Sequence, residues 1–227
     1  MVTSDKIQAT LERQRVKWEV YLVILHMEEQ FGASIPRTPD EIWAMLEHRI
    51  PATMPAGGVP LAELAEQVTQ EVGADDEQPP GWSTFKRDQL GLYYEGRTVR
   101  GHLKDCALQV QNFFPAIKNF RAKFINRVYV KDSKIRMLRD GSYLTEVDGV
   151  ETRFIQVMTR QGPRSAIKYL DYVNAPTLAF TIQLLADGII TKEHLAAVMD
   201  YGCVHGMGAE RSQGWGRYTV ESMTLLE

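Results

Sequence analysis

Trp18-Glu-Val-Tyr-Leu-Val-Ile-Leu-His-Met27 is the stretch around which a fold can be built. It is rich in β-branched and aromatic residues and is nearly all apolar, which is typical of a central strand covered on both faces. Its apolar core, Val20 to Leu25, is far too short to cross a bilayer. The sequence therefore predicts a buried strand over residues 18–27 and a water-soluble domain around it.

The residues that follow this strand predict helices. Thr38-Pro39-Asp40-Glu41 places a capping threonine before a proline and a glutamate, the pattern of a helix start, and Ile42, Met45 and Leu46 continue on one face. A second amphipathic helix is predicted from Leu61 to Val72, after a Pro/Gly/Ala linker over 51–60. Residues 28–95 are therefore interpreted as an acidic helical insertion.

The second half of the chain alternates between helix and strand patterns. Apolar residues recur at helical spacing from Val99 to Val110. A basic β-hairpin is predicted over 124–139, turning at Asp132-Ser133, and a second hairpin over 152–173, turning at Gly162-Pro163. A strand over 177–185, a helix capped by Thr191 and a strand over 215–225 complete the chain.

This element order is the split βαβ pattern of a ferredoxin-like or RRM-like domain. We therefore expect an α+β fold, with an antiparallel sheet, helices on one face, a helical insertion and a β-hairpin extension. The other face of the sheet would be free for a ligand.

The net charge conceals a strong asymmetry. The chain has 26 Lys and Arg against 29 Asp and Glu, a net charge of −3, which taken as a whole argues against a nucleic-acid-binding protein. Residues 40–95, however, hold eleven acidic against three basic residues, and residues 97–139 hold eleven basic against two acidic. The basic segment suits a polyanion, although it could equally be a solvated face that answers the acidic segment within the same fold.

A glycine-rich segment lies between the last predicted helix and the last predicted strand. Five glycines fall within residues 202–216, together with Arg211, Ser212, Trp215 and, directly after them, Arg217. Glycines allow a loop whose N–H groups converge on an anion. The segment lacks the Gly-Lys-Ser/Thr of a phosphate-binding P-loop, and it runs from helix to strand, unlike a dinucleotide-binding turn. A plain tight turn is the alternative.

Two motifs resemble the RAMP superfamily of CRISPR-associated proteins. Residues 206–218, Gly-Met-Gly-Ala-Glu-Arg-Ser-Gln-Gly-Trp-Gly-Arg-Tyr, are similar to the C-terminal glycine-rich loop of that family, and Tyr94 to Asp105 resembles its entry to the first helix, without the usual serine and second glycine. The resemblance covers residues 15–27 and 94–226. It implies one ferredoxin-like domain over 1–227 that binds guide RNA, with the basic hairpin at 124–139 as a thumb over that RNA.

The candidate RNA-binding residues come from the basic segment and from the glycine-rich loop. They are Arg97, Arg100, Lys104, Arg121, Lys123, Arg127, Lys131, Lys134, Arg136, Gly206, Gly208, Arg211, Ser212, Gly214, Trp215, Gly216 and Arg217.

Catalysis would need a group that exchanges protons near neutral pH, which histidine does best. His26, His102 and His205 are the candidates, and each could instead be a core or phosphate-contacting residue. Some RAMP subunits cut target RNA with an acidic residue after the first strand, where Glu28, Glu29 and Asp40 lie here. Cys203 and His205 supply only two potential metal ligands, so neither a metal nor a cofactor is expected.

Three functions follow from these observations. The first is an RNA-binding subunit of a CRISPR-type ribonucleoprotein, which holds guide RNA without base specificity beside copies of itself and other effector subunits. The second is a metal-independent endoribonuclease, and the third is a ferredoxin-like assembly protein without RNA. With two cysteines and no apolar leader sequence, a cytoplasmic location is expected.

Overall fold

The computed structural model describes residues 16–49 and 60–226. Most of the linker predicted over 51–60 lies outside the described residues. No helix within the described ranges is long and apolar enough to span a bilayer. The elements are β1 (Trp18–Met27), β2 (Gln30–Gly32), β3 (Ile35–Pro36), α2 (Pro39–Arg49), α3 (Leu61–Val72), β4 (Trp82–Thr84), β5 (Lys86–Asp88), β6 (Gly91–Glu95), α4 (Gly96–Val110), η1 (Gln111–Phe113), α5 (Phe120–Ile125), β7 (Val128–Val130), β8 (Lys134–Arg139), β9 (Ser142–Tyr143), β10 (Gly149–Thr159), β11 (Gly162–Asn174), β12 (Thr177–Leu185), α6 (Lys192–His205), η2 (Arg211–Gln213) and β13 (Tyr218–Leu225).

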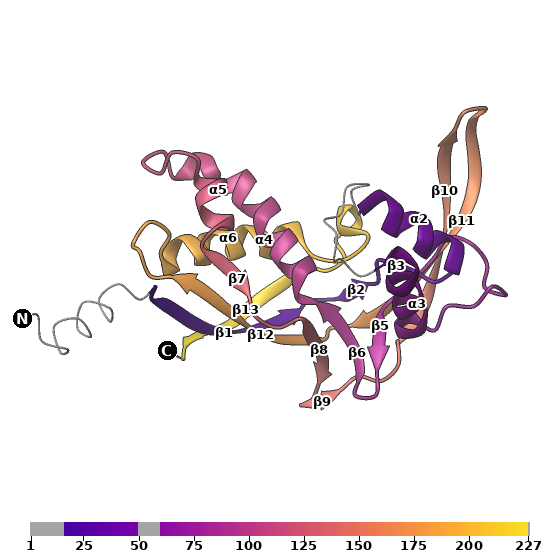
Figure 1. Ribbon diagram of the computed structural model, residues 1–227, viewed down its shortest axis with the longest axis horizontal. Coiled ribbons are helices and arrows are strands. Elements are labelled where there is room, and N and C mark those ends of the chain that lie inside the picture. The colour runs from indigo at the N-terminus through magenta and orange to yellow at the C-terminus, as the bar shows by residue number, and fades with distance from the viewer. Residues whose placement is uncertain (1–15, 50–59, 227) are drawn as a thin grey trace, which may run out of the picture.

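The main sheet has the ferredoxin-like topology. Its strands lie in the order β13-β1-β12-β8-β6-β5, and β1 pairs antiparallel with both β12 and β13. With α4 after β1 and α6 after β12, the elements β1-α4-β8-β12-α6-β13 form the βαββαβ unit. Helices α4, α5 and α6 lie on the same side of this sheet (Figure 1). The predicted α+β class is confirmed.

Side-chain alternation along β1 explains why one face carries the core. Val23, Leu25 and Met27 are buried, whereas Leu22 and Ile24, which point to the opposite face, are half-buried. The buried set joins one apolar cluster with residues of α4 and α6, such as Leu103 and Val198. The helices therefore cover one face of the sheet, as predicted.

The prediction of a basic hairpin over 124–139 is wrong. Residues 120–125 are helical, and β7 and β8 do not pair with each other but both pair antiparallel with β12. The Asp132 carboxylate accepts the Thr181 N–H (2.6 Å) between the two short strands and replaces a ladder bond there. Residues 128–139 thus follow one edge of β12 with an interruption. The turn residues Asp132-Ser133 mark a kink in the chain and not a reversal of its direction.

The second predicted hairpin is confirmed and extends from the body of the protein (Figure 1). Strands β10 and β11 pair from Gly149–Tyr172 to Thr159–Gly162, so the chain reverses two residues before the predicted Gly162-Pro163 turn. The hairpin belongs to a second sheet, in the order β10-β11-β4-β3.

The segment 28–95 contains the two predicted helices, whose residues Ile42, Leu46 and Val68 form a small separate core. Its described part also contains five strands, β2 to β6, which its composition did not predict. Strand β6 joins the main sheet beside β8, and β4 joins the hairpin sheet beside β11. This segment therefore contributes strands to both sheets. Its strands are short, two to five residues, and carry too little periodicity to be recognised from sequence.

Candidate nucleic-acid interface

The glycine-rich loop folds back on itself after α6. The Met207 N–H donates to the Gly216 carbonyl oxygen (2.8 Å), and a Cβ on Gly216 would lie 1.8 Å from the Met207 oxygen. Gly206, Gly208, Gly214 and Gly216 all have positive φ, between 70° and 88°. These glycines are therefore required by the shape of the loop.

The loop also docks on β2. The Ala209 N–H donates to the Gly32 oxygen (3.1 Å), and the Gly216 N–H donates to the Gln30 oxygen (2.8 Å). These loop amides were expected to converge on an anion, but they donate to carbonyl oxygens of the protein itself. The exposed side chains of the loop, which face solvent, are Arg211, Ser212, Gln213 and Arg217.

Trp215 does not offer the stacking surface expected from the sequence. It is only 6% exposed, with Arg153 5.0 Å above its ring and Tyr172 at its edge (5.7 Å between ring centroids). A nucleobase cannot reach a ring packed in this way, so Trp215 supports the loop from below.

The entry to α4 and the glycine-rich loop meet, although more than 100 residues separate them. The Tyr94 hydroxyl receives a hydrogen bond from the Gly208 N–H. The rings of His102 and His205 stack with 5.9 Å between centroids, and Arg211 Nη1 donates to His205 Nε2 (2.9 Å). The two segments that resemble RAMP motifs therefore pack against each other.

The three candidate histidines lie in different environments. His26 is half-buried on the open face of β1, 3.4 Å from the Thr177 hydroxyl. His102 is buried and lies 2.9 Å from the hydroxyl oxygen of Tyr218. Because the Tyr218 hydroxyl donates to the Met199 oxygen (3.3 Å), His102 Nε2 is the donor of this bond. Burial, with smaller effects of His205 and Arg211, lowers the pKa of His102 to about 3.

His205 is the candidate at the surface of this site. It lines an open hollow of about 630 Å³ with Tyr201, Arg211 and Ser212. Burial and the Arg211 charge lower its pKa below the ordinary value, so the ring is neutral at pH 7. Since Nε2 accepts the Arg211 bond, the remaining proton lies on Nδ1.

Several cations of the basic segment are neutralised within the fold. They form the pairs Arg97–Glu95, Arg127–Asp187, Lys134–Asp88 and Arg136–Asp88. Asp88 and Glu95 belong to the acidic segment, so the two segments answer each other here. Arg100 donates to the Ile125 oxygen (2.9 Å) and stacks over Tyr129, which gives it a structural role.

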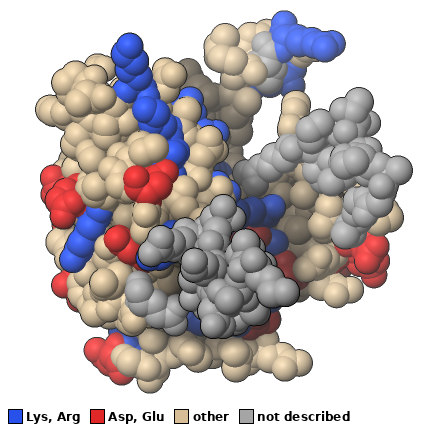
Figure 2. Space-filling model, turned by 60° about the vertical axis from the view of Figure 1, so that its left-hand side comes forward, with Lys and Arg blue, Asp and Glu red and all other residues tan. Residues whose placement is uncertain are grey.

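Other predicted cations have no carboxylate partner among the described residues. These are Lys104, Arg121, Lys123, Lys131, Arg211 and Arg217. Figure 2 shows Lys and Arg side chains projecting from the top of one face of the molecule. Fewer cations of the basic segment are therefore available to a polyanion than the charge of the sequence suggests.

The acidic candidates do not converge on this site. Glu28 and Glu29 are exposed just after β1, and Asp40 lies in the first turn of α2. Within residues 16–49 and 60–226, no three His, Cys, Asp or Glu side chains come together as a metal site.

The connection between the loop and the β10–β11 hairpin was not predicted from the sequence. The Glu210 carboxylate accepts hydrogen bonds from Arg153 Nη1 (2.9 Å) and from Lys168 Nζ (2.6 Å), two residues that face each other across the hairpin. The alternation of residues in 152–173 predicted the hairpin but not its contact with Glu210. Lys168 and Arg153 precede Glu210 by 42 and 57 residues, and ion pairs between residues so far apart leave no local pattern in the sequence.

Comparison with known proteins gives little sequence similarity. No family model matches the chain, and no curated protein matches it. A chain in a cryo-EM structure of the Type III-B Cmr-beta bound to cognate target RNA is similar in structure, with 13% sequence identity and a TM-score of 0.49. The match covers 98% of this protein and 65% of that chain, so this protein spans about two thirds of the length of the chain it matches.

Proposed function

We propose that this protein is an RNA-binding subunit of a CRISPR-type ribonucleoprotein. One observation carries the proposal: the α4 entry and the glycine-rich loop, the two segments that resemble RAMP motifs, meet around His205. Arg211 and Arg217 are exposed there, without a carboxylate partner in the described part of the chain. Copies of itself and other effector subunits are its expected partners.

The proposed recognition is of the RNA backbone. Arginine and serine side chains bind phosphate oxygens, and such contacts fix an RNA without reading its sequence. Trp215, the aromatic residue of the loop, is buried and cannot stack on a base. Sequence would be read by base pairing of the bound guide.

The test is binding of labelled single-stranded RNA at several salt concentrations. We expect similar affinity for unrelated sequences and a steep loss of affinity with salt. Arg211→Ala with Arg217→Ala should weaken binding to all sequences and reduce the slope of log K against log salt by about 0.7 for each phosphate contact removed. Arg87→Ala is the matched control, because Arg87 pairs with Glu146. Unchanged affinity and slope in the double variant would make the loop a structural turn.

A second candidate function is metal-independent RNA cleavage, and His205 is the observation that favours it. It is neutral, half-buried and hydrogen-bonded to an arginine that could hold a phosphate. Release of Arg211 would free the Nε2 lone pair to take the proton of an attacking hydroxyl, and the imidazolium formed in this way would give a proton to the leaving oxygen. Cleavage in the presence of EDTA that His205→Ala abolishes would support this function, whereas intact RNA argues against it.

The third candidate is a ferredoxin-like assembly protein without RNA, whose acidic segment docks on the basic segment of a neighbour. It predicts a preparation free of nucleic acid and no retention of single-stranded RNA at low salt. That result would overturn the RNA-binding proposal.

A further inference from the structure

The outer part of strand β11 has an open edge. Beside Tyr169 and Leu170, β11 pairs with β4, and the Tyr169 N–H donates to the Gly81 oxygen (3.0 Å) on the side away from β10. Backbone groups alternate along a strand, so the N–H groups of Ile167 and Ser165 point to that same side. Among the described residues, no strand pairs with β11 there.

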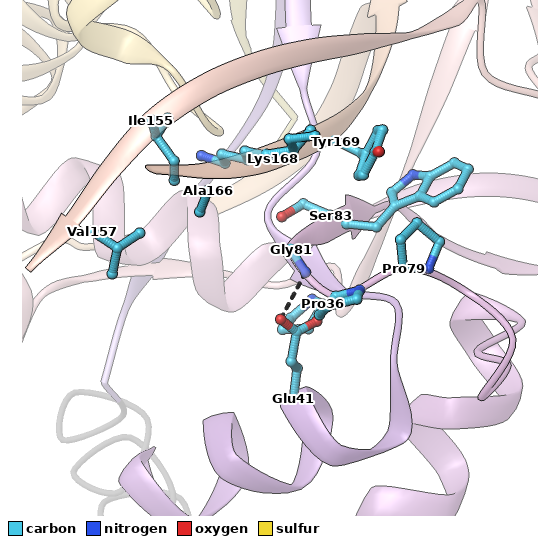
Figure 3. A pocket seen from close by; sticks show the side chains of 13 residues that line it. Pro36, Glu41, Pro79, Gly81, Ser83, Ile155, Val157, Ala166, Lys168 and Tyr169 are labelled. Carbon is cyan, nitrogen blue, oxygen red and sulfur yellow. Dashed lines mark hydrogen bonds between the residues drawn. The ribbon is translucent and has the colours of Figure 1, made fainter. Parts of the chain in front are cut away.

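An apolar groove lies along this edge. It has a volume of about 730 Å³ and runs between the hairpin, the Pro79–Trp82 stretch and the start of α2. Ile155, Val157 and Ala166 line it from the hairpin, opposite Pro36 and Glu41 (Figure 3). Val157 is 42% exposed and Ile155 is 36% exposed, so the groove presents aliphatic surface to solvent.

The polar groups of the groove are mostly satisfied. Glu41 Oε1 accepts the Gly81 N–H (2.8 Å), and its Oε2 accepts the Thr38 hydroxyl (2.7 Å). Lys168 is paired with Glu210. Arg164 lies on the same face as Val157, its cross-strand neighbour, beyond the lining of the groove. Its Nη2 donates to the side-chain oxygen of Gln161, and its charge has no carboxylate partner among the described residues. The unneutralised charge beside the groove is therefore cationic, at the outer end of the hairpin.

We propose that this groove binds an extended segment of another protein, which adds as a strand to the open edge of β11. The segment would place apolar side chains at alternate positions in the groove and a carboxylate beside Arg164. Strand addition uses the free backbone groups for affinity and the groove for specificity. It also covers a long apolar edge, which would otherwise favour aggregation.

A nucleobase fits this groove less well than a peptide. Its hairpin wall is aliphatic, and the Trp82 ring is already engaged by Arg37 (4.5 Å above it) and by Tyr169 (5.5 Å between centroids). This interaction is independent of the proposed RNA contacts on the glycine-rich loop.

The test uses a fluorescein-labelled peptide, Asp-Val-Glu-Val-Asp-Val-Glu-Val-Thr, and fluorescence anisotropy with the full chain. We expect saturable binding, and much weaker binding of a peptide with lysine in place of each acidic residue. Hydrogen exchange should show slower exchange of the Ile167 amide in the complex. An unlabelled oligouridylate should not displace the peptide.

Two pairs of variants locate the site. Ser165→Pro removes one outward N–H and should weaken peptide binding about fivefold, whereas Ser165→Thr should not. Proline is compatible with this edge, because Pro163 occupies the preceding outward position. Val157→Asp should abolish binding, whereas Phe154→Asp should leave it unchanged, because Phe154 is 82% exposed and does not line the groove.

The proposal is overturned if the acidic peptide does not bind, or if Ser165→Pro and Val157→Asp bind it as the wild type does. It is also overturned if oligouridylate displaces the peptide and both variants lose RNA binding, since the groove would then belong to the RNA. Loss of RNA binding in Arg211→Ala with Arg217→Ala, with peptide binding intact, separates this proposal from the RNA-binding function.

Discussion

Lys168 Nζ lies 2.6 Å from Oε1 of Glu210, and this ion pair joins the β10–β11 hairpin to the glycine-rich loop. Arg153 binds the other oxygen of the same carboxylate (2.9 Å). Glu210 has φ of 58°, a left-handed conformation that is uncommon for a residue with a side chain. The hairpin and the loop are therefore held in one arrangement by a residue whose backbone is strained.

Glu210→Gln should loosen that arrangement. The amide keeps one acceptor but leaves Arg153 and Lys168 without a negative charge, so we expect a loss of about 1–3 kcal/mol in the free energy of unfolding. Urea denaturation measures this, and hydrogen exchange should be faster at the base of the hairpin. Glu151→Gln is the control, because Glu151 is more exposed and its contact with Arg153 is longer, at 3.7 Å. Equal effects of the two variants would contradict the role given to Glu210.

Two glycines of the loop should differ sharply in their tolerance of alanine. Gly216→Ala meets both a positive φ and the Met207 oxygen at 1.8 Å, and we expect a loss of about 3–5 kcal/mol. Gly214→Ala has the positive φ but only the Arg217 side chain nearby, at 3.7 Å, so about 1–2 kcal/mol is expected. Thermal denaturation distinguishes the two. Comparable losses would show that the folded-back loop is not formed in solution.

His102 should make folding weaker in mild acid. The unfolded chain binds a proton at this residue below its ordinary pKa of 6.5, whereas the folded protein does so only near 3. The unfolded state thus holds more protons between these values, and stability falls as pH decreases through this window, by at most about 1.4 kcal/mol per pH unit. Urea denaturation at several pH values from 7 to 5 measures the slope.

His102→Gln should reduce that slope, because glutamine can donate to Tyr218 but does not titrate. His205→Gln is the companion variant, since the pKa of His205 is also lowered. The measurement stays above pH 5 so that carboxylates do not add to the slope. Lys86 and Lys168 lower the pKa values of Glu71 and Glu210, so the contribution of these carboxylates to stability is lost only at more acidic pH. The same slope in His102→Gln as in the wild type would be the contrary result.

Lys123, in α5, and Arg127, two residues after the end of that helix, should contribute unequally to RNA binding. Lys123 has no carboxylate partner among the described residues, whereas Arg127 is 2.8 Å from Asp187. Lys123→Ala should therefore lower RNA affinity and reduce the salt slope by about 0.7, and Arg127→Ala should change both less. Filter binding across salt concentrations measures this. The opposite order would mean that the Asp187 pair opens when RNA binds.

Local patterns predicted the elements that are long and periodic. The strand at 18–27, the helices beginning at Pro39 and Leu61, the helix over 99–110 and the β10–β11 hairpin all follow from apolar spacing, capping or turn residues. The segment 124–139 does not form the predicted hairpin, because alternation along a strand does not specify its partner. Val128–Val130 and Lys134–Arg139 each have the pattern of a strand, yet both pair with β12.

The composition of the sequence predicted the candidate site, and the packing of the fold decided which of its groups are exposed. Gly206 and Gly216 were expected to cradle an anion, and their conformation instead closes the loop on Met207 and β2. Trp215 was expected at the surface and lies beneath Arg153. Arg211 remains exposed, as a ligand contact requires.

By itself, the sequence determined the order of strands and helices, the asymmetry of charge and the unusual glycine-rich segment, because each is carried by neighbouring residues. Only the tertiary structure decided which charges are available. Asp88 neutralises Arg136 from 48 positions away, and Glu210 binds Lys168 from 42 positions away, whereas Lys123 and Arg211 have no carboxylate partner among the described residues. The strength of a charge at a surface depends on which opposite charges lie within a few ångströms, and that distance is set by the fold.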